Sequence, residues 1–346
     1  MRKLWDNKVS RRRLLGSAAA ASAAVPVLHE LVPHRSLHNQ FASAREEALH
    51  SGHQLHSGSG HRGAVGRVSA SANGFDPQEI LRDFDTGTMR NGVREWEIVA
   101  KDRKIEVAPG VFYDAWTYND RVPGPTLRAR EGERLRIRFT NASIHPHTMH
   151  FHGIHRDLSD GIPGIGPGNI DPGESTVYEF DATPFGLHLY HCHSTPLAEH
   201  IAKGLYGAFI IDPKRGRPEA DELVMVMNGF DTNFDRANEV YAVNTVAFEY
   251  LHRPVVVRRD QLVRIYLVNA LEFDLLNSFH IHANFFDYYP TGTRLEPRDF
   301  TDTVIQGQGE RGILELRFPY TGKYMFHAHV SEFAELGWMG FFEVTD

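Results

Sequence analysis

The chain has 346 residues, enough for two domains of ordinary size that each bury a hydrophobic core. It carries 37 Lys and Arg against 44 Asp and Glu, a net charge of −7, which argues against nucleic acid as a partner. Its single cysteine, Cys192, excludes an internal disulfide framework. A lone thiol among 21 histidines therefore needs another explanation.

Residues 1–30 have the pattern of an export signal. Basic residues precede a short alanine-rich apolar run that is too short to span a bilayer. The pair Arg11 and Arg12, followed within three residues by Leu14 and Leu15, resembles a bacterial twin-arginine signal. We expect export to the periplasm or the extracellular space, with no membrane span in the mature chain; an ordinary N-terminal helix is the alternative.

Residues 31–88 are expected to form a flexible leader, because their polar, glycine-rich and serine-rich composition buries too little apolar surface to fold. Six histidines recur in its first part: His34, His38, His50, His53, His56 and His61. They could capture copper loosely, although a plain linker explains the same composition.

From about residue 92 the sequence changes to short segments that alternate apolar and polar residues, which is typical of β-strands. Turn sequences such as VPGPT (122–126) and DPGES (171–175) separate them. No long amphipathic helix is evident. The pattern predicts an all-β chain built as a β-sandwich. The strand-like segments of the first half are 94–100, 104–110, 133–141, 174–182 and 205–213.

The second half repeats the scheme, so we divide the chain into modules at 89–215 and 216–346. NSFHIH, ending at His282, matches HTMHFH, ending at His152. Both copies keep His-x-His, but the second has Asn277 where the first has His147. In the partner motif the first copy reads His-Cys-His and the second reads His-Ala-His. Because the extra histidine and the cysteine are lost together, we infer that they belong to one site.

Strand geometry separates two kinds of site. Residues two apart on a β-strand share a face, and neighbours point to opposite faces. His191 and His193 should therefore project one way and Cys192 the other. In a regular strand, His147 should likewise point away from His150 and His152. One site should hold Cys192 with His147, and the other should hold imidazoles.

Thiolate and two imidazoles in a β-sandwich are the ligand set of a type 1 blue copper. His200, on the loop after Cys192, is the plausible second histidine. Leu205 stands where an axial methionine often sits, and an apolar axial group should raise the reduction potential.

The remaining His-x-His motifs form two quartets of histidines, one in each module. Neither quartet alone makes a sensible closed site for a single metal ion. Together they give eight imidazoles, enough for a three-copper cluster with two ligands on one ion and three on each of the others. Zinc would compete for any four of them but would leave the cysteine unexplained. The first quartet is His150, His152, His191 and His193, and the second is His280, His282, His327 and His329.

These motifs resemble the multicopper oxidase family, in particular its two-domain members with the blue copper in the first cupredoxin domain. The resemblance covers roughly residues 92–345 and implies two tandem cupredoxin-like Greek-key β-sandwich domains. It also implies four coppers per subunit, one of type 1, one of type 2 and two of type 3. By analogy with copper nitrite reductases, a homotrimer would form the trinuclear sites between subunits.

The resemblance also implies a role for each candidate copper ligand. The type 1 ligands would be His147, Cys192 and His200, and the type 2 ligands would be His150 and His280. The type 3 ligands would be His152, His191, His193, His282, His327 and His329. Dioxygen reduction consumes protons, and Asp160 and Glu332 are the candidate catalytic carboxylates. For each, a plain surface or turn carboxylate is the alternative. His145 and His155 would lie near the metals or at the surface without binding them.

The leading hypothesis is an exported oxidase that takes single electrons from a small reducing substrate and reduces dioxygen to water. Phenols, aromatic amines and metal ions are all candidate donors. Copper nitrite reductase is the nearest rival, but it would need an aspartate at the position of His150 and no histidine after the cysteine. A non-enzymatic copper-binding or electron-transfer cupredoxin would need no paired His-x-His in the second module.

Overall fold

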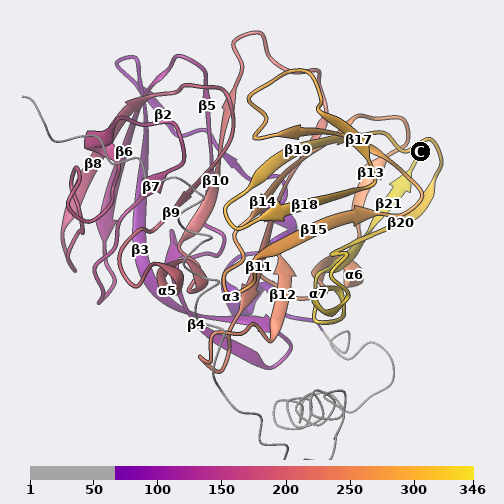
Figure 1. Ribbon diagram of the computed structural model, residues 1–346, viewed down its shortest axis with the longest axis horizontal. Helices are drawn as coiled ribbons and strands as arrows, with labels where there is room; N and C mark the ends of the chain where they lie inside the picture. The colour runs from indigo at the N-terminus through magenta and orange to yellow at the C-terminus, as the bar shows by residue number, and fades with distance from the viewer. Residues whose placement is uncertain (1–66) are drawn as a thin grey trace, which may run out of the picture. The chain divides into compact units, whose positions relative to one another are not determined.

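The computed structural model describes residues 67–346, and Figure 1 shows them as two modules of β-sheet. The strands of the first module are β1 (Phe84–Asp85), β2 (Thr88–Arg90), β3 (Val93–Ala108), β4 (Val111–Tyr118), β5 (Thr126–Arg130), β6 (Arg134–Asn141), β7 (His150–Phe151), β8 (Ser175–Asp181), β9 (Gly186–His191) and β10 (Tyr206–Asp212). Its helices are all short: α3 (Ala70–Asn73), α4 (Pro77–Ile80), the 3-10 helix η1 (Asp157–Ser159) and α5 (Leu197–Ala202).

The second module repeats this composition. Its strands are β11 (Asp221–Phe230), β12 (Val240–Val243), β13 (Val255–Arg258), β14 (Val263–Asn269), β15 (Leu276–Ile281), β16 (Phe286–Pro290), β17 (Asp299–Thr301), β18 (Thr303–Gly307), β19 (Arg311–Leu316), β20 (Gly322–His327) and β21 (Met339–Thr345). Its helices are α6 (Glu249–His252) and α7 (Ser331–Glu335). Among the described residues no helix is long and apolar enough to cross a bilayer.

Each module is a sandwich of two sheets whose strand order differs from the chain order, as in Greek-key folds. In the first module the orders are β1-β5-β10-β9-β7 and β2-β3-β6-β8, with β4 paired to β3. In the second they are β12-β11-β14-β19-β16-β17 and β13-β21-β20-β15-β18. Alternate residues of β6 face inward, so Leu135, Ile137 and Phe139 are buried while their neighbours are not. The predicted all-β sandwich architecture is confirmed.

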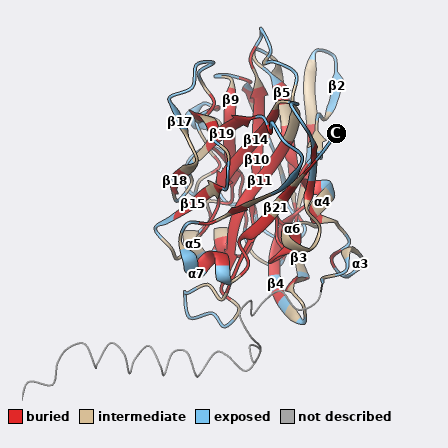
Figure 2. Cartoon of the chain, turned by 90° about the vertical axis from the view of Figure 1, so that its right-hand side faces the viewer, coloured by how far each residue is buried: buried red, intermediate tan, exposed pale blue. Residues whose placement is uncertain are grey.

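A third hydrophobic core joins the two modules. Leu187, Leu189 and Ile210 of the first pack with Val224 and Val268 of the second. The strands β9, β10, β11 and β14 are consequently buried on both faces, and Figure 2 shows them as a continuous buried centre. The alternation predicted for 205–213 is therefore not the exposure pattern of β10, because the second module covers its outer face.

The end of the predicted leader is folded. Residues 67–88 contain α3, α4 and β1, and Leu81 of this segment is fully buried in the hydrophobic core of the second module. Asp76 pairs with Arg253 across 177 positions of sequence, and the Arg82 guanidinium bonds Asp221 at 2.9 Å. The expectation of a leader extending to residue 88 is therefore wrong for this part, because a few apolar and charged side chains fix it to the sandwich. The export signal and the leader histidines lie outside the described residues.

Candidate metal centre

The thiol of Cys192 lies in a closed group with two imidazoles. Its Sγ is 3.2 Å from Nδ1 of His200 and 3.9 Å from Nδ1 of His147, and the two Nδ1 atoms are 3.2 Å apart. Cys192 and His147 are completely buried and His200 nearly so. Three parts of the chain converge here: Cys192 directly follows β9, His200 lies in the last turn of α5, and His147 lies in the segment before β7. The three donors can all reach one ion.

Burial prepares these groups for a metal. Desolvation lowers the pKa of His147 to about 3 and that of His200 to about 4, so both rings are neutral at physiological pH. Nε2 of His147 lies 3.0 Å from the Ser143 hydroxyl, which leaves its Nδ1 directed at the sulfur. Burial raises the pKa of the Cys192 thiol, and the backbone N–H of Thr148 opposes this by donating to Sγ at 3.3 Å.

The first histidine quartet lies on the other side of Cys192. Ring centroids of His152, His191 and His193 are 5.1, 5.2 and 5.3 Å from that of His150. The two strands β7 and β9 place His150 opposite His191. Nε2 of His152 is 2.9 Å from Nε2 of His191. The expected separation of Cys192 from its two flanking imidazoles is thus present, although Cys192 and His193 lie just beyond the last residue of β9.

Outer hydrogen bonds turn the ring nitrogens of the quartet inward. Nδ1 of His191 is 2.8 Å from its acceptor, the Cys192 carbonyl, and Nδ1 of His150 is 2.7 Å from a carboxylate oxygen of Asp160. A neutral imidazole that donates from Nδ1 presents a lone pair at Nε2. Desolvation lowers the pKa of His191 to about 4 and that of His152 to about 3, so these rings are neutral. Imidazole lone pairs that face one another in this way are suited to binding a cation.

The second quartet repeats the first. Centroids of His282, His327 and His329 are 5.1, 5.3 and 5.2 Å from that of His280. Nε2 of His282 is 3.0 Å from Nε2 of His327, and Nδ1 of His327 donates to the Ala328 carbonyl. This quartet is more open, since His282 and His329 are exposed. The exposed Phe285 and Phe300 stack beside it.

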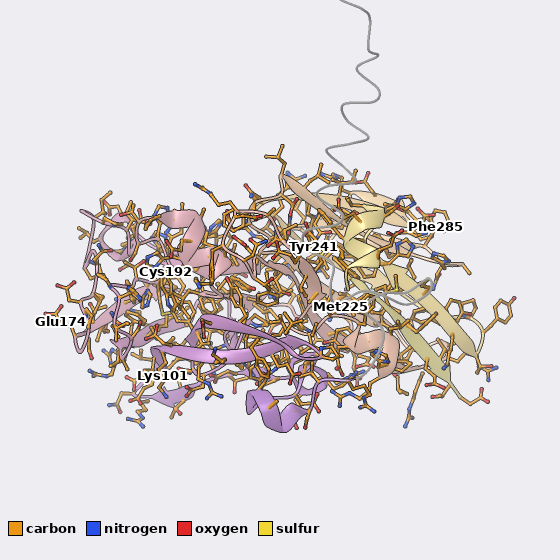
Figure 3. The ribbon with its side chains drawn as sticks, turned by 90° about the horizontal axis from the view of Figure 1, so that it is seen from below. Lys101, Glu174, Cys192, Met225, Tyr241 and Phe285 are labelled. Atoms are coloured by element: carbon orange, nitrogen blue, oxygen red, sulfur yellow. The ribbon has the colours of Figure 1, made fainter. Side chains whose placement is uncertain are left out.

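The two quartets are separate within one chain. In residues 67–346 no hydrogen bond or ring contact joins a member of one to a member of the other. Figure 3 shows Cys192, beside the first quartet, and Phe285, beside the second, on opposite sides of the view. The described part of the chain therefore carries two separate histidine clusters, each able to hold a metal ion.

The two predicted carboxylates differ. Asp160 accepts from His150 at 2.7 Å and lies 3.4 Å from Nε2 of His155, so it is part of the first quartet's surroundings. Glu332 is exposed on α7, and no contact ties its carboxylate to the histidines in the described part of the chain. The ring of His145 is tilted against that of Trp116, with 4.6 Å between the ring centroids, and His145 is not one of the three donors of the sulfur site.

In the second module, core side chains occupy the position that corresponds to the sulfur site. Ala328 donates to the carbonyl of Trp338 as Cys192 donates to that of Leu205, so Trp338 takes the place of Leu205. The buried indole packs against Phe279 and Phe326. Both Nε1 of Trp338 and Nδ2 of Asn277 are buried without a hydrogen-bond partner among the described residues.

Sequence reasoning missed several residues that support the site. Trp116 is in ring contact with His145, His147 and His200. Thr148, within the histidine motif itself, also accepts from the N–H of His193 at 2.8 Å, and its position between two candidate ligands was a usable signal. Trp116 comes from the distant strand β4 and carried no such signal.

Comparisons with known proteins agree with this geometry. Family models described as multicopper oxidase match residues 100–216 and 218–346. A solved structure described as a multicopper oxidase is 63% identical, with a TM-score of 0.79, and covers 81% of this chain and 100% of its own. The blue copper oxidase of Nitrosomonas europaea is 26% identical, with a TM-score of 0.66, covering 73% of this chain and 86% of its own.

Among curated relatives, the copper-containing nitrite reductase of Neisseria gonorrhoeae is 29% identical over 258 residues. That match covers 67% of this chain and 63% of the relative, so the chain spans less than two thirds of that protein's length. The two family matches together cover well over half of the sequence. The chain belongs to the multicopper oxidase family, as a two-domain member related in architecture to the copper nitrite reductases.

Proposed function

We propose that this protein is a laccase-like oxidase that takes electrons singly from a small reducing substrate and uses them to reduce dioxygen to water. One observation carries the proposal. Cys192 contacts His147 and His200 on one side, while the residues bonded to it in the chain, His191 and His193, belong to a histidine quartet on the other. The backbone thus connects an electron-accepting sulfur site to a second centre through covalent bonds.

The family implies copper, and the donor atoms fit it, since thiolate and neutral imidazole are its preferred ligands. We assign the type 1 ion to His147, Cys192 and His200, and the other three of four ions per subunit to the two quartets. Of these, His150 and His280 would hold the type 2 ion. Bound copper would supply one-electron transfer at the sulfur site and dioxygen reduction at the quartets.

The residues around the sulfur would favour an oxidising centre. Leu205 is fully buried next to Cys192 and offers no side-chain donor, and Trp116 covers the rings of His147 and His200. The N–H of Thr148 donates to the thiolate and withdraws charge from it. With copper bound, each of these features would stabilise the reduced ion relative to the oxidised one.

A pocket beside Trp116 suits the electron donor. It has a volume of about 450 Å³ and is lined by Trp116, His145, Asp102, Asp114 and Glu199, together with three cationic side chains. An aromatic floor and mixed charges fit small phenols or aromatic amines, and the carboxylates leave metal ions as candidates.

We infer a homotrimer in which the first quartet of one subunit meets the second quartet of the next. The separation of the half-sites within one chain supports this. The second quartet lies beside exposed apolar side chains, among them Phe300 at 70% and Phe285 at 48% exposure, which a partner would cover. The family's nitrite reductase neighbours make the arrangement plausible.

Nitrite reduction is the second candidate, because curated relatives carry that name. His150 and His193 argue against nitrite reduction, because both belong to the first quartet and a single type 2 ion would not need them as ligands.

We also propose that residues 1–30 direct export of the enzyme from the cytoplasm.

The deciding experiment combines metal analysis, absorption and paramagnetic resonance with turnover on dioxygen and on nitrite. We expect about four coppers per chain, an intense visible thiolate band, a near-ultraviolet shoulder and oxygen consumption with a phenolic donor. Two coppers per chain, no such shoulder and turnover of nitrite would favour the reductase.

A further inference from the structure

A cavity of about 300 Å³ lies against the first quartet on the side of the second module. One wall carries His150, His152, His191 and His193. The second module contributes residues 269–272, which begin at the last residue of β14, and residues 308–309. The cavity therefore joins the quartet to a segment of the second module that lies about 80 to 120 positions further along the sequence.

Glu272 is the one carboxylate among the residues that line this cavity. It is half-buried, and its side chain makes no hydrogen bond or ion pair with any residue of 67–346. Its backbone is nevertheless held, because its carbonyl accepts from Nδ2 of Asn238 at 2.7 Å. Asn269, at the start of the segment, bonds the carbonyls of Gln306 and Gly307. A fixed backbone thus presents a free carboxyl group to the cavity.

Removal from water raises the pKa of Glu272 to about 7, and no charged neighbour adds to this shift. The other titratable groups on the cavity wall are the four imidazoles and the phenol of Tyr206. Arg311 is close enough to His152 to lower its pKa, and Glu310 bonds the N–H of Gly307. Near neutral pH, Glu272 is therefore present both as acid and as carboxylate, which is the state a proton carrier requires.

Asp160 cannot do the same work. Its carboxylate is already engaged by Nδ1 of His150, on the side of the ring away from Nε2. It can orient His150, but a proton leaving it would have to break that bond. The two carboxyl groups therefore differ in their hydrogen bonding: that of Asp160 is engaged by His150, and that of Glu272 has no partner among residues 67–346.

We propose that Glu272 carries protons from solvent into the cavity beside the first quartet and supplies those consumed when dioxygen is reduced. The inference rests on the proposed oxidase function. Each dioxygen takes four electrons from four one-electron donor oxidations and four protons, and yields two waters. With each delivery Glu272 changes from carboxylic acid to carboxylate, and solvent protonates it again, so the residue is unchanged over the cycle.

The test compares Glu272→Gln and Glu272→Asp with Glu296→Gln, a matched control in an exposed carboxylate. In the full-length, copper-loaded enzyme, Glu272→Gln should lower kcat for oxygen consumption about 100-fold near neutral pH, with the donor KM, copper content and visible band unchanged. Glu272→Asp should recover part of the rate. In the wild type kcat should fall as pH rises through neutrality, and this dependence should be absent from Glu272→Gln.

Infrared difference spectroscopy gives a readout independent of turnover. A carboxylic acid band that titrates in the neutral range should be present in the wild type and in Glu296→Gln, and absent from Glu272→Gln. An unchanged kcat and pH profile in Glu272→Gln, or loss of its copper, would overturn the inference. A wild type that loads copper but does not reduce dioxygen would instead show that the proposed function itself had failed.

Discussion

Thr148 donates its backbone N–H to the sulfur of Cys192 at 3.3 Å. Its hydroxyl accepts from the N–H of His193 at 2.8 Å, so one residue contacts both the sulfur and the strand end that carries the quartet. In the second module the Ser278 hydroxyl accepts from His329 in the same way, although no sulfur is present. The second module thus has the hydrogen bond that fixes the end of the histidine strand, although it has no sulfur site.

Replacing Cys192 by Ser should remove the visible thiolate band and donor oxidation, because the serine hydroxyl is a poor ligand and breaks the electron route. About three of four coppers should remain, since the quartets keep their donors. Copper analysis and absorption spectra check this. Normal donor oxidation in Cys192→Ser would contradict the proposed route.

Ser143→Ala should weaken copper binding at the sulfur site about 10–100-fold, because Nε2 of His147 loses the hydroxyl that orients the ring. A copper titration followed through the visible band measures the change. Ser175→Ala is the control, since its hydroxyl bonds only Thr140 at an exposed position. Equal affinities in both variants would argue that packing alone orients His147.

Asp160→Asn should lower kcat at least about tenfold, because an amide is a weaker acceptor for the Nδ1–H of His150. Glu332→Gln should behave like the wild type, because the Glu332 side chain is exposed and has no tie to a histidine among the described residues. Steady-state oxygen consumption distinguishes them. A larger loss in Glu332→Gln would restore it as the catalytic carboxylate.

Mixed trimers test whether the half-sites meet between subunits. A variant with His150→Ala and His152→Ala lacks half of the first quartet, and one with His280→Ala and His282→Ala lacks half of the second. Each should be inactive alone. When the two are unfolded and refolded together, some interfaces pair two intact quartets, so part of the oxygen consumption should return. No recovery, in mixtures shown by mass spectrometry to be mixed trimers, would place the cluster within one chain.

The copper-free protein should lose stability as pH falls below about 6.5. Burial depresses the folded-state pKa of His147 to about 3 and of His200 to about 4, from an ordinary value of 6.5. Between these values the unfolded chain binds more protons than the folded one. The contribution of these rings to the free energy of unfolding is therefore fully present above pH 6.5. It declines on acidification by up to about 1.4 kcal/mol per pH unit for each ring. Urea unfolding at pH 7 and pH 5 measures it; equal free energies would contradict it.

Much of the site was accessible from the sequence because strand parity is local. The spacing of His191, Cys192 and His193 alone predicts two faces, and the repeat alone predicts that His147 accompanies the sulfur. Burial on both faces of β10 was not accessible, since it depends on how the modules pack. Glu272 was hidden for the same reason: its segment reaches the first quartet only through the contact between modules.

The indole of Trp338 has a consequence for how the protein could change. Introducing a thiol at Ala328 would not create a second metal site, because the space such an ion would need is filled by an aromatic ring in the core. Asn277, which stands where the first module has His147, and Trp338 would have to change with it. Under the proposed function, each chain would then have one site at which electrons enter, and the four electrons needed for each dioxygen would pass through it one after another.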